Sequence, residues 1–76
     1  MKDGLGSRIL KLGSIGPDVR ELQLILQSLG YNPGPIDGIY GHRTMNAVMR
    51  FQKDNGLTVD GIVGPETLNM IYQLYP

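Results

Sequence analysis

The chain has 76 residues, 41% of them hydrophobic, with seven basic and seven acidic residues and no cysteine. This length limits the chain to one domain, and without disulfides a compact apolar core has to stabilise it. Zero net charge argues against nucleic acid as a partner, and no apolar run approaches the roughly 20 residues of a membrane span, so no membrane partner is expected either.

The first helix signal is Gly16-Pro17-Asp18. Proline suits the first helical position, and an acidic side chain there meets the positive end of the helix dipole. Apolar residues then follow at helical spacing, and Gly30 suits the position after a helix: Val19, Leu22, Leu26 and Leu29. The pattern predicts a helix over residues 17–29. We expect residues 1–8 to be a poorly ordered extension and residues 9–76 to form the domain. The N-terminus lacks the apolar core of a signal peptide.

Two further helices are predicted after a loop. Residues 31–40 contain two prolines and two glycines, which indicates a loop. A second helix is expected between Gly41 and Asn55-Gly56, with an apolar face formed by Thr44, Ala47, Val48 and Phe51. Gly64-Pro65-Glu66 repeats the opening of the first helix and starts a third, with an apolar face formed by Thr67, Met70, Ile71 and Leu74.

An internal repeat joins these elements. The pattern Asp-Gly-Ile-x-Gly-x-x-Thr occurs at residues 37–44 and again 23 residues later at residues 60–67. Its aspartate can accept hydrogen bonds from backbone N–H groups ahead of it, and the glycine after it can take positive φ. We expect the isoleucine to enter the core, the second glycine to allow close backbone approach, and the threonine hydroxyl to bond locally. The repeat predicts an all-α fold, a small three-helix bundle built on a glycine-rich turn-to-helix unit.

Spaced residues along nearly the whole chain resemble a known family. These are Leu12-x-x-x-x-Gly16-x-x-Val19-x-x-Leu22-Gln23-x-x-Leu26-x-x-Leu29-Gly30-Tyr31, Asp37-Gly38-x-Tyr40-Gly41-x-x-Thr44-x-x-Ala47-Val48-x-x-Phe51-Gln52, and Gly56-Leu57-x-x-Asp60-Gly61-x-Val63-Gly64-Pro65-x-Thr67. Together they are similar to the peptidoglycan-binding domain of type 1. The resemblance implies a three-helix bundle that binds bacterial peptidoglycan in the extracellular cell wall, covalently linked to an amidase, muramidase, peptidase or transpeptidase. The pro-segment of matrix metalloproteinases is also similar, but it silences its enzyme with a cysteine that this chain lacks.

No catalytic constellation is apparent in the sequence. His42 is the only imidazole, and it lies at the predicted start of a helix beside Arg43, where a positive charge is disfavoured. Asp37 and Asp60 could form the carboxylate pair of a glycosidase, but the Asp-Gly context favours a role in turns. We therefore assign no catalytic residue, metal ligand or cofactor, and assign structural turns to Asp37, Gly38, Gly41, Asp60, Gly61 and Gly64.

Five residues are candidates for ligand binding. Tyr31 and Tyr40 bracket the loop, and their rings could contact sugars and peptides or could cover the core. Arg43, Asn46 and Arg50 share the outer face of the second helix, where arginine could hold the free carboxylates of peptidoglycan stem peptides or could be solvated. Gln23 and Gln52 could pin loop backbone or face ligand, and the structural role is favoured.

Two hypotheses about function follow. The first is a non-catalytic module that binds peptidoglycan and anchors a cell-wall hydrolase. The alternative is a protein-interaction domain or pro-domain that packs on its partner enzyme, which an exposed apolar patch would favour.

Overall fold

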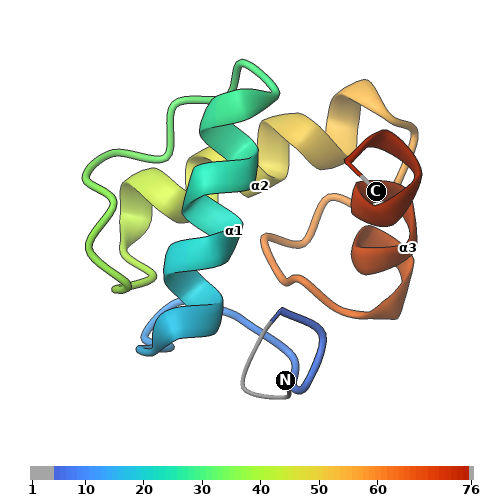
Figure 1. The fold of residues 1–76 in the computed structure, drawn as a ribbon. Coiled ribbons are helices and arrows are strands. Elements are labelled where there is room, and N and C mark those ends of the chain that lie inside the picture. Colours follow the sequence, from blue (N-terminus) through green and yellow to red (C-terminus); the bar gives the residue numbers. More distant parts are fainter. Residues whose placement is uncertain (1–4, 76) are drawn as a thin grey trace.

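The structure is a computed structural model that describes residues 5–75. These residues form three helices, α1 (Pro17–Ser28), α2 (His42–Asp54) and α3 (Pro65–Leu74), and no strand beyond two isolated β-bridges. In Figure 1, α1 crosses in front of α2, and α3 lies on the other side of α1 from the loop that joins α1 to α2. The prediction of an all-α, three-helix fold is confirmed. Within the same residues, no helix is long and apolar enough to cross a membrane.

The helices begin and end where local signals in the sequence place them. Helix α1 starts at Pro17 and ends at Ser28, one residue before the predicted end at residue 29. Gly30 follows with φ +94°, the left-handed conformation that commonly closes a helix. Helix α3 likewise starts with Pro65 at its first position and carries Glu66 in its first turn. Since these signals act within a few residues, the sequence was sufficient to find them.

The segment before α1 connects the two glycine-rich turns. Leu10 and Val63 exchange both backbone hydrogen bonds, at N···O distances of 3.2 and 2.8 Å. A few residues further on, Gly16 N donates to Gly38 O at 3.0 Å. Residues 10–16 therefore bond to the turn before α3 at one end and to the turn before α2 at the other.

The core holds eleven hydrophobic side chains, each at most 5% exposed. The three helices and the turns that precede α2 and α3 all contribute to it, and Leu10 adds a further side chain. Its members are Leu10, Val19, Leu22, Ile25, Leu26, Tyr40, Ala47, Val48, Phe51, Val63 and Ile71. Most of the predicted apolar positions of α1 and α2 belong to this set, which confirms the helical spacing there.

The predicted apolar face of α3 is only partly correct. Ile71 is buried, but Met70 is only partly buried and Leu74 is 47% exposed. Leu74 is the last residue of α3, beyond the part of the helix that contacts the core. The prediction that Leu74 belongs to the buried apolar face was therefore wrong, because the core does not cover the last turn of this short helix.

The isoleucines of the repeat do not enter the core, contrary to prediction. Ile39 and Ile62 are 49% and 36% exposed, whereas the residues that follow them, Tyr40 and Val63, are 1% and 0% exposed. Neighbouring side chains in extended backbone point to opposite sides. The bridges between Ile15 and Ile39 and between Leu10 and Val63 show that these turns run as extended backbone. Burial of the next residue therefore turns each isoleucine outward.

The glycines that precede α2 and α3 do not mark close backbone approaches, as had been expected. Gly41 and Gly64 have φ −97° and −104°, and no atom lies within 4 Å of a Cβ built on either residue. Both are the N-cap residues of their helices, a position where glycine is tolerated. A short polar side chain would fit at both sites.

The predicted N-terminal extension can be compared with the structure only from residue 5, because residues 1–4 lie outside the described part. Leu5 is partly buried against the core. Its backbone N donates to Glu21 Oε1 at 3.1 Å, and its carbonyl accepts from the Tyr72 hydroxyl at 3.0 Å. Residues 5–8 thus contact both α1 and α3.

Candidate functional site

Gln23 of α1 holds the turn that leads into α2. Its Nε2 donates to Asp37 Oδ1, Ile39 O and Thr44 Oγ1 at 3.2, 3.0 and 3.0 Å. Its Oε1 accepts the backbone N–H groups of Asp37 and Gly38 at 3.1 and 2.9 Å. The side chain is 1% exposed, so it has the structural role favoured from the sequence and does not face ligand.

Gln52 of α2 repeats this arrangement at the turn that leads into α3. Its Nε2 donates to Asp60 Oδ1, Ile62 O and Thr67 Oγ1 at 2.9, 2.9 and 3.0 Å. Its Oε1 accepts from the backbone N–H groups of Asp60 and Gly61 at 3.1 and 3.0 Å. Helices α1 and α2 therefore each carry a buried amide that fixes the start of the next helix.

The aspartates and glycines of the repeat complete both turns. Asp37 Oδ1 accepts the backbone N–H of Ile39, and Asp60 Oδ1 accepts that of Ile62, both at 3.0 Å. Gly38 and Gly61 have φ of +75° and +70°, as their turns require. The hydrogen bonds from Ile39 N–H and Gln23 lower the pKa of Asp37, because they favour its charged form.

The threonine of the repeat bonds at long range, and the prediction of a local bond was wrong. Thr44 Oγ1 donates to Pro33 O at 3.0 Å, eleven residues away, while it accepts from Gln23. This contact fixes the loop between α1 and α2 to the first turn of α2. The sequence could not show it, because it depends on how the loop folds back.

The start of α1 is held by an ion pair instead of a glutamine. Arg8 Nε and Nη2 donate to the two carboxylate oxygens of Asp18 at 2.8 and 3.1 Å, and Nη2 also donates to Ile15 O at 2.8 Å. Asp18 is 4% exposed, and its Oδ1 also accepts Val19 N–H at 2.9 Å. The hydrogen bond from Arg8 lowers the pKa of Asp18, against the opposing effect of burial.

This pair gives stability a dependence on acid pH. Because the pKa of Asp18 is lower in the folded chain, its contribution is fully present above the unfolded value of about 4 and is lost as pH falls through the folded pKa. We expect the parent to lose more free energy of unfolding than Arg8→Gln between about pH 5 and about pH 2. Urea unfolding of both proteins across that range would measure the difference. Parallel curves would show that the pair does not set the pKa of Asp18.

Tyr40, one of the predicted ligand-binding residues, is buried. It is 1% exposed, and its hydroxyl donates to Gly61 O at 2.7 Å. Burial is the main cause that raises the pKa of Tyr40 far above its usual range. The ring joins the turn before α2 to the turn before α3, so it is not part of any surface that could contact ligand.

Tyr31, the other predicted tyrosine, is half-buried at the opposite end of the loop. Its ring meets Phe51 edge to face, with centroids 5.7 Å apart and planes at 84°. Its hydroxyl donates to Asp54 Oδ2 at 2.8 Å, and this bond is the main cause that raises the pKa of Tyr31. Arg50 lies close enough to oppose that shift. The exposed edge of the ring thus lies in a polar cluster at the end of α2.

The remaining predicted residues, Arg43, Asn46 and Arg50, are all exposed, on one face of α2. Arg43 lies at the start of the helix, where its side chain covers Gly34 of the loop, and a Cβ built on Gly34 would be 3.0 Å from Arg43 Cβ. Arg50 lies two turns further along, towards Tyr31. The predicted loop and helix face are therefore neighbours, although Tyr40 is not available on their surface.

Three adjoining hollows run across the starts of α1 and α2, and we call them together the trough. The first, of about 320 Å³, is lined by Ser7, Arg8, Ile15, Gly16, Pro17 and Asp18. The second, of about 210 Å³, shares three of these residues and adds Arg20, Asp37 and Gly38. The third, of about 140 Å³, shares Asp37 and is lined also by Pro33, Pro35, Ile39, Gly41, His42, Arg43 and Thr44. Each hollow carries one arginine.

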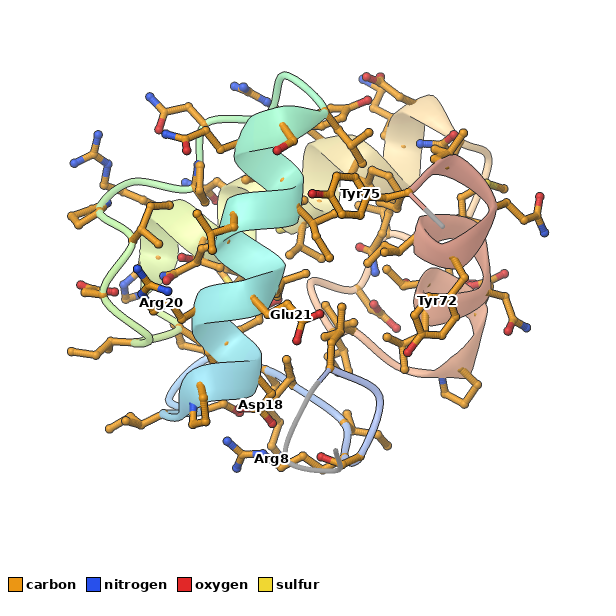
Figure 2. All side chains as sticks on the ribbon, viewed as in Figure 1. Arg8, Asp18, Arg20, Glu21, Tyr72 and Tyr75 are labelled. Carbon is orange, nitrogen blue, oxygen red and sulfur yellow. The ribbon has the colours of Figure 1, made fainter. Side chains whose placement is uncertain are left out.

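Sequence reasoning missed Arg8, Ile15 and Arg20 as part of a surface. Figure 2 shows Arg8 beside Asp18 at the start of α1, and Arg20 on the side of α1 that faces the loop. One signal was present: Gly13-Ser14-Ile15-Gly16 has the same Gly-x-x-Gly form as Gly38-Ile39-Tyr40-Gly41. Two turns of similar form in one small domain could have suggested that their isoleucines lie side by side.

Acidic and basic side chains are used differently within residues 5–75. All six acidic residues in this range accept a hydrogen bond from within the chain: Asp18, Glu21, Asp37, Asp54, Asp60 and Glu66. Among the basic residues in the same range, only Arg8 forms an ion pair. Over these residues, no hydrogen bond or ion pair involves the side chains of Lys11, Arg20, Arg43, Arg50 or Lys53. Within the described residues, no acceptor occupies the donors of these five side chains, which suits them to an anionic ligand.

No metal centre is assembled in this part of the chain. Over residues 5–75, no three potential metal-ligating side chains come together. Asp37 and Asp60, which could have formed a glycosidase pair, each belong to a separate turn that their own hydrogen bonds hold. The geometry is that of a surface that can bind through arginine donors and exposed aliphatic groups.

Comparison with known proteins identifies relatives of this arrangement. Residues 15–71 match the family model described as "Putative peptidoglycan binding domain". An N-acetylmuramoyl-L-alanine amidase of Mycobacterium tuberculosis is 51% identical over 59 residues, which are 78% of this chain and 14% of that protein. The zinc D-Ala-D-Ala carboxypeptidase of Streptomyces albus G is 49% identical over 73 residues, which cover 90% of this chain and 28% of that protein.

Solved structures agree in fold. The SleB N-terminal domain superposes with a TM-score of 0.88 at 35% identity, and the match covers 93% of this chain and 97% of that domain. An L,D-transpeptidase of Xylanimonas cellulosilytica gives a TM-score of 0.84 at 43% identity, over 91% of this chain and 34% of that structure. With most of its length matched by the family model, the chain belongs to the peptidoglycan-binding domain family.

Proposed function

We propose that the chain is a non-catalytic module that binds bacterial peptidoglycan and holds an associated hydrolase or peptidase on the cell wall. Family membership is the observation that carries this proposal. The chain spans 14% and 28% of the two enzymes compared above, whose names describe an amidase and a carboxypeptidase. The catalytic part of such a protein would then lie outside these 76 residues, and the bacterial cell wall outside the cytoplasm would be its place of action.

The distribution of free basic side chains supports a proposal for the surface that binds the wall. Stem peptides of peptidoglycan carry free carboxylates, and arginine binds carboxylates through paired, charge-assisted hydrogen bonds. Arg20 and Arg43 line the trough, Asn46 and Arg50 continue along the outer face of α2, and Tyr31 of the loop lies beside the end of that helix. We place the binding surface on these residues. Tyr40 is left out because it is buried.

Co-sedimentation with purified, insoluble peptidoglycan tests the function. We expect the chain to pellet with the walls, and less of it to pellet as salt increases, because exposed ion pairs are screened. The walls themselves should stay intact, with no loss of turbidity and no release of soluble fragments. A chain that stays in the supernatant at low salt would contradict the binding role, and clearing of the walls would contradict the non-catalytic role.

One feature favours the alternative, a domain that packs on its partner enzyme. Tyr72, Leu74 and Tyr75 of the α3 end are 49%, 47% and 44% exposed, and Figure 2 shows both tyrosines on the side of α1 away from Arg20. Exposed large hydrophobic side chains at one end of a helix suit contact with another domain. A Leu74→Ser, Tyr75→Ser variant should bind walls like the parent if α3 only contacts a partner domain. Loss of wall binding with an unchanged melting curve would instead place α3 in the wall-binding surface.

A further inference from the structure

We infer that the trough recognises a short zwitterionic peptide, with its carboxylates on Arg20 and Arg43 and an amino group on Asp37. This rests on the proposed function and deepens it, since the occupant within peptidoglycan would be the stem peptide and not the glycan strand. The three charged side chains alternate in sign along the trough, because the second hollow contains Arg20 and Asp37 and the third contains Asp37 and Arg43.

Two of the charged side chains have donors to offer. Over residues 5–75, neither Arg20 nor Arg43 takes part in a hydrogen bond or ion pair. Both side chains start beside a loop glycine: the aliphatic part of Arg43 lies over Gly34, and Arg20 Cβ lies beside Gly38. The two guanidinium groups therefore leave their helices next to the hollows that they line.

Asp37 offers one acceptor oxygen between the two arginines. Its Oδ1 accepts from Ile39 N–H and Gln23, while Oδ2 has no hydrogen bond within residues 5–75. A carboxylate held by its own turn cannot swing across to neutralise either arginine without breaking that turn. The alternation of charge is therefore built into the backbone, and an ammonium group is the complement of the remaining oxygen.

Exposed isoleucines separate the charged positions and favour a ligand with aliphatic groups. Ile15 and Ile39 pair through a β-bridge, and they are 67% and 49% exposed. Ile15 lines the second hollow and Ile39 lines the third. Small aliphatic side chains such as alanine methyls would remove apolar surface from water there. No phenylalanine, tyrosine or tryptophan lines the trough, and its one aromatic ring is the small imidazole of His42 at the third hollow. The exposed tyrosines that Figure 2 labels lie at the end of α3, Tyr72 within the helix and Tyr75 directly after it. The trough thus lacks a tyrosine, phenylalanine or tryptophan ring on which a sugar could stack.

The inference is tested with a synthetic stem pentapeptide, L-Ala-γ-D-Glu-L-Lys-D-Ala-D-Ala, and with the same peptide after amidation of its carboxylates. In an NMR titration of the full chain, we expect the free-acid peptide to shift the methyl signals of Ile15 and Ile39. The amidated peptide should bind at least about tenfold more weakly, because hydrogen bonds between charged partners are lost. Equal binding of both peptides, or shifts confined to α3, would overturn the inference.

Matched variants separate specific contacts from general attraction. We expect the double variant Arg20→Gln, Arg43→Gln to bind the peptide at least about tenfold more weakly than the parent. The control is the double variant Lys11→Gln, Lys53→Gln, which removes the same charge outside the trough. It should change the affinity less than about twofold. Asp37→Asn keeps an oxygen for Ile39 N–H and Gln23 and should weaken binding of the free-acid peptide while it preserves the fold. Thermal melts verify that each variant is folded. If the lysine variant binds as weakly as the arginine variant, the attraction is unspecific and the inference is wrong.

Sedimentation with two materials distinguishes binding to stem peptides from binding to glycan. One is intact peptidoglycan, and the other is peptidoglycan from which an amidase has removed the stem peptides. We expect the parent chain to pellet with intact walls and not with the stripped glycan. Equal pelleting with both would place the ligand on the glycan, so the function would stand and the inference would fall. No pelleting with either material would contradict the function itself.

Discussion

Replacement of Gln23 by alanine is expected to lower the free energy of unfolding by at least about 3 kcal/mol. The change removes five hydrogen bonds from a side chain that is 1% exposed. It leaves the buried N–H of Gly38 without a partner, which costs about 1–3 kcal/mol, and it removes the hydrogen bonds that Thr44 Oγ1 and Ile39 O accept, each worth about 1 kcal/mol. Small domains have a total stability of only about 5–15 kcal/mol, so the loss would be a large share of it.

Gln27, one helical turn further along α1, provides the control. It is exposed, and Gln27→Ala should change stability by no more than about 0.5 kcal/mol. Gln52→Ala should behave like Gln23→Ala, because the two glutamines make the same five kinds of hydrogen bond. Chemical unfolding followed by circular dichroism measures all three. A Gln23→Ala variant as stable as Gln27→Ala would show that water replaces the amide without cost.

The second large loss of stability is expected when alanine replaces the first glycine of each repeat. Gly38→Ala and Gly61→Ala each force a side chain onto φ of +75° and +70°, which costs roughly 1–2 kcal/mol. Gly38→Ala should cost more, because its Cβ would lie 3.1 Å from the backbone oxygen of Gly16. The Cβ of Gly61→Ala would meet Met45 Cγ at 2.9 Å, and the flexible methionine side chain can move away.

The last glycine of the second repeat is the matched control. Gly64 has φ −104° and open space around it, and serine is at least as good an N-cap as glycine. Gly64→Ser should therefore leave the melting temperature unchanged or raise it slightly. Thermal melts of the three variants under one set of conditions make the comparison. Similar destabilisation at Gly61 and Gly64 would mean that positive φ is not what the turns require.

Short-range patterns in the sequence carried most of what could be predicted about the fold. Pro17, Gly30 and Pro65 mark helix ends through the conformations that proline and glycine favour, and these preferences act within a turn of the chain. The repeat also identified Asp37 and Asp60 as residues that bond backbone two positions ahead. The same patterns were misleading at Ile39 and Ile62, since alternation in extended backbone depends on which neighbour is buried.

The candidate site needed contacts between residues far apart in the chain. Arg20 looked like an ordinary exposed residue of α1, and Asp37 like a turn residue, because nothing within a few positions of either indicates the other. They come together in one hollow because Gly16 N bonds Gly38 O and Ile15 pairs with Ile39. The sequence also could not distinguish the buried tyrosine from the exposed one. The structure shows that Tyr40 is buried and donates to Gly61 O.

By itself, the sequence determined the three helices, the two glycine-rich turns and the family, because each is recorded in residue types at fixed short spacings. Tertiary structure alone decided that Gln23 and Gln52 bond turns fourteen and eight residues away. It also decided that Tyr40 is buried and Ile39 exposed, and that Arg20, Asp37 and Arg43 share one trough. The physical reason is that a buried polar group bonds to whichever partner the packed core brings next to it. Residues far apart in the sequence become neighbours only in the folded chain.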